Sequence, residues 1–227
     1  MYIVGAGLAG LIAAYKFPEA VVIEKGGQKE SHRAVLRFRT DAISQITGIN
    51  FKKVTVRKGI YHKGDFVEPN IQLANSYSKK VLGEVAGDRS IWNIESCTRF
   101  IAPHDFYEQL IRGLDGRIMW NQDFNFNNTA RPVISTAPLP VTTKACGIAL
   151  DEPFHAVPIY TYRYKLNDVR NVYQTIYYPD SDIPVYRASI TDDTLIIESM
   201  SDEEFIGTGA FTQVCESFGI NNTAYGS

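Results

Sequence analysis

The sequence predicts an α/β protein in which a parallel β–α–β unit at the N-terminus is joined to a mainly antiparallel sheet. Two observations predict this fold. The chain begins with a short apolar run at 1–4, a glycine-rich turn and an alanine- and leucine-rich helix at 8–15. Between 154 and 200 it carries four short apolar runs, the first three with tyrosines, separated by Pro-Asp and Asp-Asp turns. Short runs of this kind between turn signals are typical of antiparallel strands with one buried face.

The N-terminal turn has the pattern G-x-G-x-x-G, formed by Gly5, Gly7 and Gly10. In dinucleotide-binding units the first glycine permits the tight turn, and the second lets the backbone approach a pyrophosphate. The third lets the helix pack closely on the strand. Because a pyrophosphate binds at the positive end of a helix, the pattern predicts a dinucleotide site where this helix begins.

A second apolar run at 20–23 ends in Glu24, 19 residues after Gly5. Dinucleotide-binding units place here the acidic residue that holds the adenosine ribose. The two strands, the turn, the helix and the acidic residue follow in the order expected of a dinucleotide-binding unit. This order disfavours the alternative, in which the turn is only rich in glycine and the glutamate is unrelated to it. An acidic residue at this position favours an unphosphorylated ribose, and hence FAD or NAD over NADP.

Three arginines, Arg33, Arg37 and Arg39, follow within seven residues. Guanidinium groups bind phosphates well, so this cluster is a candidate for neutralising a pyrophosphate or a substrate phosphate. A solvated basic edge strand is the alternative. Thr40 is predicted to cap the next helix, which runs to about Gly48.

Further along, the segment 51–96 is predicted to be mostly strands, with a hairpin turn at Lys63 to Asp65. A helix is predicted to start at 103–105 and to end at Asp115-Gly116. A buried strand at 133–134 ends in the small residues Ser135 to Ala137. Small residues at the end of a strand let its backbone lie close to a cofactor. The alternative is that the strand simply leads into a loop.

Bulk composition excludes several classes of protein. The chain has 227 residues, 44% hydrophobic and 21% charged, with a formal net charge of -2. These values are ordinary for a soluble globular protein and favour neither nucleic acid nor a membrane as partner. No apolar run is long enough to span a bilayer, and no signal peptide pattern is present. Three scattered cysteines and four dispersed histidines predict a cytoplasmic protein without a metal site.

The residues above resemble FAD-dependent oxidoreductases of the glutathione-reductase-like fold, in the branch of amine oxidases, aromatic hydroxylases and UDP-galactopyranose mutases. Four stretches carry the likeness: GAGLAG with Glu24, HRAVLRFRTDAISQITGI, VISTAP and YYPDSDIPVYRASI. A fainter likeness, in the segments LRFR and YEQL, is to uncharacterised flavoproteins encoded by bacteriophages. The resemblance implies a Rossmann-like FAD-binding domain, at 1–50 and 100–150. An inserted antiparallel-sheet substrate domain is then expected at 51–99 and 151–227.

The resemblance also implies which residues bind the cofactor FAD. They are Gly5, Gly7, Leu8, Ala9, Gly10, Glu24, Lys25, Arg33, Thr136 and Ala137. Arg187 is the candidate for an anionic substrate group, with Tyr186 and Tyr178 as neighbours, although a surface strand arginine is an equal alternative. His32 is a weaker acid–base candidate. Most of the other tyrosines are expected to pack on the sheet.

The implied function is redox catalysis by FAD on a small, amine-like substrate. Two alternatives stay open. One is a non-redox flavoenzyme of the mutase type, in which Arg187 would hold a diphosphate, and the other is a flavin-fold binding module without turnover. The C-terminal Gly-Asp element usual in this fold is missing from FTQVCESFGINNTAYGS, so the chain has lost it or is part of a longer protein. The sequence contains no second G-x-G-x-x-G, so a built-in NAD(P)H domain is not expected.

Overall fold

The computed structural model describes residues 1–28, 36–87, 91–151, 157–167, 172–203 and 207–220. The chain forms two compact units. Unit 1 comprises Met1–Lys53 and Arg99–His155, and unit 2 comprises Val54–Thr98 and Ala156–Ser227. The chain therefore passes between the units three times. None of the described helices is long and apolar enough to cross a membrane.

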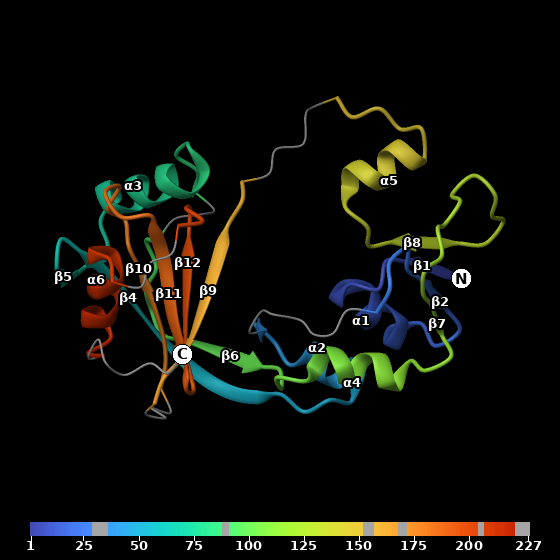
Figure 1. The fold of residues 1–227 in the computed structure, drawn as a ribbon, viewed down its shortest axis with the longest axis horizontal. Coiled ribbons are helices and arrows are strands. Elements are labelled where there is room, and N and C mark those ends of the chain that lie inside the picture. Colours follow the sequence, from blue (N-terminus) through green and yellow to red (C-terminus); the bar gives the residue numbers. More distant parts are fainter. Residues whose placement is uncertain (29–35, 88–90, 152–156, 168–171, 204–206, 221–227) are drawn as a thin grey trace. The chain divides into compact units, whose positions relative to one another are not determined.

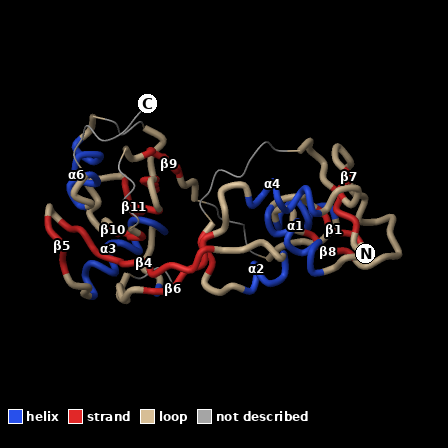
Figure 2. Tube along the Cα trace, turned by 90° about the horizontal axis from the view of Figure 1, so that it is seen from below, coloured by secondary structure: helices blue, strands red, loops and turns tan. Residues whose placement is uncertain are grey.

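Unit 1 is built on a four-stranded parallel sheet, some of whose strands are labelled in Figure 2. Its strands, in spatial order, are β7 (Ile118–Met119), β2 (Val21–Ile23), β1 (Tyr2–Val4) and β8 (Val133–Ser135). The first strand of the chain thus lies inside the sheet, between a neighbour close in sequence and one far away. A short antiparallel pair joins β3 (Arg37–Phe38) to β6 (Cys97–Ile101).

Four helices accompany this sheet: α1 (Leu8–Lys16), α2 (Ala42–Thr47), α4 (Phe106–Gly113) and α5 (Leu139–Ala145). Helix α1 packs against α2 and α4. Ile3, Leu11, Val22 and Leu110 are fully buried in the shared core of strands and helices. This burial of apolar side chains holds the N-terminal β–α–β unit together.

Arg117 ties the end of α1 to the start of β7. Its Nη2 donates hydrogen bonds to the carbonyl oxygens of Ala14 and Phe17, both at 2.8 Å, and of Ala20 at 3.0 Å. The carbonyls at the C-terminal end of a helix lack partners within the helix, so a guanidinium satisfies them well.

We expect Arg117→Met to lower the free energy of unfolding by about 2–3 kcal/mol, because several carbonyls lose a charged donor. Urea denaturation followed by circular dichroism measures this loss. The matched control is Arg112→Met, since the Arg112 side chain is 73% exposed and, among the described residues, makes only a surface ion pair with Asp105. That control should cost about 0.5 kcal/mol or less. Equal losses in the two variants would contradict the role of Arg117.

Unit 2 is built on a second sheet with the strand order β4-β10-β11-β12-β9, visible in Figure 1. These strands are β4 (Lys52–His62), β10 (Tyr173–Tyr177), β11 (Val185–Thr191), β12 (Thr194–Ser199) and β9 (Tyr160–Lys165). The pairs β10–β11, β11–β12 and β12–β9 are antiparallel, and β10 pairs parallel with β4. The predicted α/β class with an antiparallel second sheet is therefore confirmed.

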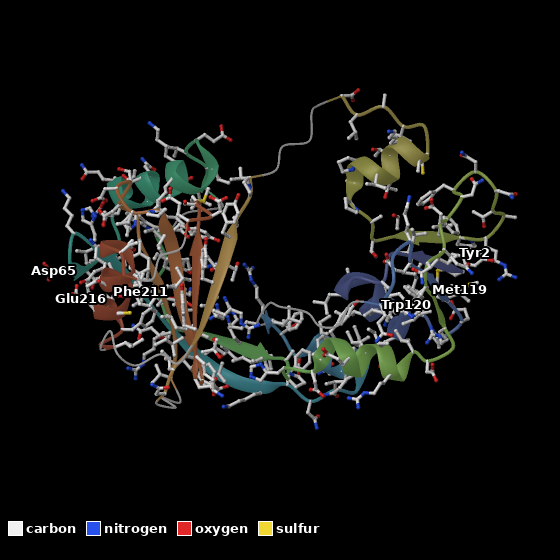
Figure 3. The ribbon with its side chains drawn as sticks, viewed as in Figure 1. Tyr2, Asp65, Met119, Trp120, Phe211 and Glu216 are labelled. Atoms are coloured by element: carbon white, nitrogen blue, oxygen red, sulfur yellow. The ribbon has the colours of Figure 1, made fainter. Side chains whose placement is uncertain are left out.

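Helices α3 (Ile71–Leu82) and α6 (Gly209–Ser217) cover opposite faces of this sheet. Ile176 and Tyr177 are neighbours on β10, so their side chains point to opposite faces. Ile176 belongs to the cluster that contains Phe211 of α6, and Tyr177 packs on the cluster that contains Tyr77 of α3. Phe211 is seen on α6 in Figure 3.

The predicted hairpin turn after β4 is confirmed. Lys63 and Gly64 have φ values of 51° and 90°, so both lie in the left-handed region. Two consecutive residues of this kind form the turn that matches the twist of an antiparallel pair. Strand β5 (Asp65–Val67) then pairs with the end of β4.

Two local predictions were wrong. The segment 51–96 is not mostly strands, because it contains the twelve-residue helix α3. The side chain of Asn70 accepts a hydrogen bond from the Leu73 N–H at 2.9 Å, and Gly83 ends the helix with φ 83°. These residues are ordinary helix caps. Helix α2 is capped at Asp41 rather than Thr40, and it ends at left-handed Gly48 as predicted.

Candidate dinucleotide site

The candidate site in unit 1 is the turn between β1 and α1, where two of the three predicted glycines are required by packing. Gly5 has φ 101°, a conformation that other residues rarely adopt, and its N–H donates to the Ile23 carbonyl at 2.9 Å. A Cβ on Gly10 would lie 1.9 Å from the carbonyl oxygen of Gly5. The close approach of α1 to β1 therefore depends on a glycine at each position.

Gly7 differs from the other two glycines. Its φ of -69° and ψ of 174° are open to any residue, and a Cβ on Gly7 would meet no atom within 4 Å. Neither backbone conformation nor packing requires a glycine here. Gly7 is also the N-cap of α1, and within the part of the chain that the structure describes no side chain caps that helix end. Leu8 and Ala9 form the first turn, which contains no acidic residue.

Glu24 follows β2 and reaches the turn. Its Oε2 accepts a hydrogen bond from the Ala6 N–H at 2.8 Å, and its Oε1 accepts one from the Gly26 N–H at 2.8 Å. A carboxylate offers about four acceptor positions, so each oxygen keeps one for another donor. The carboxylate is thus fixed beside the glycine turn with acceptor capacity left over.

Tyr107 on α4 holds the same turn from the other side. Its hydroxyl donates to the Ala6 carbonyl at 3.0 Å, and the side chain is buried. Burial raises the pKa of Tyr107, and the nearby charge of Glu24 raises it further. The hydroxyl therefore stays protonated and keeps donating. Tyr107 could not be singled out from the sequence, because its position in a predicted helix gives no sign of which turn it contacts.

Thr136, predicted from the small-residue strand end, is brought to the glycine turn. Its hydroxyl lies 3.0 Å from the Val4 carbonyl oxygen and 3.1 Å from that of Gly5. A Cβ on Gly5 or on Gly10 would come within 2.8 Å of this hydroxyl oxygen. Ala137 is the next residue and is half-buried. The end of β8 thus completes the turn beside β1.

The other predicted cofactor contacts are less defined. Lys25 forms an ion pair with Asp123 at 3.1 Å, and both side chains are about three-quarters exposed. Arg33 and His32 lie outside the described residues. Arg37 is on β3, and Arg39 is exposed just before α2.

The residues predicted to contact substrate lie in unit 2. The Arg187 guanidinium forms two hydrogen bonds with the Glu198 carboxylate, the one from Nη2 to Oε1 measuring 2.6 Å. Burial opposes the charge of Arg187, but these bonds outweigh it and raise its pKa. An anionic substrate would have to share this guanidinium with Glu198. Tyr186 is 3% exposed beneath it, and Tyr178 is fully buried with its hydroxyl bonded to Ser217 at 2.7 Å.

No protein-family model matches this sequence, and no curated protein matches it. Solved structures match it in fold. Reduced UDP-galactopyranose mutase aligns with a TM-score of 0.55 and 12% identity, over 97% of this chain and 79% of that one. An oxidoreductase from Methanosarcina mazei aligns with a TM-score of 0.57 and 11% identity, over 96% and 82%. CtdE in complex with FAD aligns with a TM-score of 0.52 and 13% identity, over 89% and 59%.

At these identities the likeness concerns the fold. The chain shares its fold with these proteins, which include an oxidoreductase and a protein in complex with FAD, and this confirms the fold that the sequence resemblance implied. Within that fold, the glycine turn, Glu24 and Thr136 come together in unit 1, whereas Arg187, Tyr186 and Tyr178 belong to unit 2.

Proposed function

We propose that this chain binds FAD at the turn between β1 and α1 and acts as an FAD-dependent oxidoreductase on a small, amine-like substrate. The observation that carries the proposal is Gly7. Packing accounts for Gly5 and Gly10, but nothing among the described residues accounts for a glycine at position 7. Close approach of a ligand to the backbone does account for it, because a Cβ would occupy the space that a pyrophosphate needs.

The surrounding groups suit the ligand. The uncapped N-terminus of α1 offers backbone N–H groups and a positive partial charge to a pyrophosphate. The remaining acceptor positions of Glu24 suit ribose hydroxyls, and its negative charge disfavours a phosphorylated ribose. The residues present therefore fit FAD, and Thr136 and Ala137 supply the neighbouring strand end.

When bound, FAD would supply electron transfer between the substrate and an acceptor. The chain's own contribution in unit 1 is to hold and orient it. Tyr107, Glu24 and Thr136 each hydrogen-bond to the backbone of residues 4–6 and so fix the turn before any ligand arrives. Such preorganisation lowers the entropy lost on binding. The amine-like substrate is supported by the sequence resemblance alone.

The first experiment is an absorption spectrum of the purified chain before and after incubation with FAD and desalting. We expect flavin bands that survive desalting in the wild type and are largely lost in Glu24→Gln, which removes the negative charge. Glu19→Gln is the matched control, because Glu19 is an exposed residue in the turn before β2. A wild-type chain that stays colourless, or equal retention in both variants, would overturn the proposed site.

The second experiment addresses the reaction. Anaerobic addition of primary amines to the flavin-loaded chain should bleach the absorption band of oxidised flavin, and air should restore it. Retained yellow colour with no bleaching by any amine would reject the amine oxidation and leave the flavin site intact.

A further inference from the structure

Unit 2 contains a cleft of about 810 Å³ that the proposed flavin site does not use. One wall is α3, which contributes Leu73, Ser76 and Lys79. The opposite wall is the segment 179–184 between β10 and β11, and the turn after β4 closes one end. All of the lining residues belong to unit 2, so the cleft is complete within that unit.

A partly buried charge fixes the two walls to each other. The ammonium of Lys80 on α3 donates hydrogen bonds to the carbonyl oxygens of Tyr178 at 2.9 Å, Asp180 at 2.6 Å and Val185 at 2.6 Å. All three donors of the ammonium are therefore used. Burial lowers the pKa of Lys80 to about 8, and the carboxylates of Asp180 and Asp182 oppose that lowering. Lys80 is thus charged at pH 7.

Asp180 fixes the end of the cleft in the same way. Its Oδ1 lies 2.6 Å from Nδ1 of His62, and its Oδ2 accepts a hydrogen bond from the Lys63 N–H at 3.1 Å. The β4–β5 turn, the segment 179–184 and α3 are thereby linked through two charged side chains. A cleft held in this way exists before any ligand binds, which favours affinity.

The cleft lining carries three lysines, Lys63, Lys79 and Lys80, against two carboxylates, Asp180 and Asp182, so it has a net positive charge. Asp180 and Asp182 lie near Lys80 and offset its charge. The side chains of Lys63 and Lys79 make no hydrogen bond or ion pair within the described part of the chain, and both are exposed at the rim. The floor is apolar, with Leu73, Ile183 and Met200. Shape and charge together call for a ligand with an apolar body and one negative group.

We propose that this cleft binds a small organic carboxylate, with its apolar body on Leu73, Ile183 and Met200 and its carboxylate at Lys79 and the Ser76 hydroxyl. The proposal does not depend on flavin binding. A carboxylate at Lys79 gains a charge-assisted hydrogen bond, and the apolar floor removes the rest of the ligand from water. An amine of the same shape would meet a lining with a net positive charge.

Met200 provides a reporter inside the cleft. The chain has three methionines, and the other two, Met1 and Met119, belong to unit 1. Figure 3 shows Met119 on the strand region of that unit. The experiment is an NMR titration of the full chain, labelled with [methyl-13C]methionine, with 4-methylpentanoate. A Met200→Leu variant assigns the signal.

We expect the Met200 signal to shift in a saturable way while the Met1 and Met119 signals stay in place. An amine of similar shape, 3-methylbutylamine, should leave all three unchanged. Lys79→Gln should weaken carboxylate binding about threefold to fivefold, the usual range for an exposed charged contact. Lys53→Gln, a change at an exposed lysine that does not line the cleft, should leave it unchanged.

Three results would overturn the proposal: no Met200 shift, an equal shift with the amine, or equal affinity in Lys79→Gln and the wild type. None of them bears on the flavin site, which is read separately from the absorption spectrum.

Discussion

Gly7→Ala is expected to fold like the wild type and to lose FAD. The new methyl group meets no protein atom within 4 Å, and the backbone angles at position 7 are ordinary for alanine. The thermal midpoint should therefore change little. The methyl group projects into the space proposed for the pyrophosphate, so flavin retention after desalting should fall by about tenfold or more, in line with the loss of a close charged contact.

Gly10→Ala is the contrasting variant in the same motif. A Cβ there would lie 1.9 Å from the Gly5 carbonyl oxygen, and backbone cannot yield as a flexible side chain can. We expect α1 to separate from β1 and the chain to be recovered largely unfolded, with or without FAD.

A further control distinguishes ligand loss from any effect of adding a methyl group. A Cβ on Gly209, which begins α6 in unit 2, would also meet no atom within 4 Å. Gly209→Ala should retain both stability and flavin. If Gly7→Ala kept FAD as well as Gly209→Ala does, no ligand would approach the backbone at Gly7.

Lys80→Met is expected to produce the largest loss of stability among folded variants. Methionine keeps much of the volume but leaves the carbonyls of Tyr178, Asp180 and Val185 without their donor. Lys80 is partly buried, and the loss of three charge-assisted hydrogen bonds is expected to cost about 3–5 kcal/mol in the free energy of unfolding. Urea denaturation monitored by circular dichroism measures the change.

Lys79→Met is the matched control for this variant. Lys79 is the preceding residue on the same helix, is exposed, and makes no ion pair within the described residues. Its replacement should change the free energy of unfolding by about 0.5 kcal/mol or less. Similar losses at positions 79 and 80 would mean that the three carbonyl contacts do not stabilise unit 2.

The N-terminal unit could be predicted from sequence because each of its signals is local. Gly5, Gly10 and Glu24 lie within 20 residues of one another. The strand, turn and helix that call for these residue types are neighbours in the sequence. The hairpin turn at Lys63 and Gly64 was predictable for the same reason.

Helix α3 was missed because its sequence lies beside strongly alternating strands, although Leu73, Ala74, Tyr77 and Val81 follow helical spacing and form its buried face. The local signals were present in the caps, Asn70 and Gly83. The partners of Tyr107, Lys80 and Arg187 could not be predicted, because each contact depends on how distant segments pack. Lys80, for example, bonds to residues about 100 positions away.

The position of β1 has a consequence for synthesis on the ribosome. One of its neighbours, β2, is made almost at once, but the other, β8, is about 130 residues further along the chain. At about 5–20 residues per second, that edge of β1 waits on the order of 10 s for its partner. During that interval β8 is still unmade, so the nascent chain presents an apolar strand edge. We therefore expect early association of this chain with ribosome-bound chaperones, ending once residues 133–135 emerge.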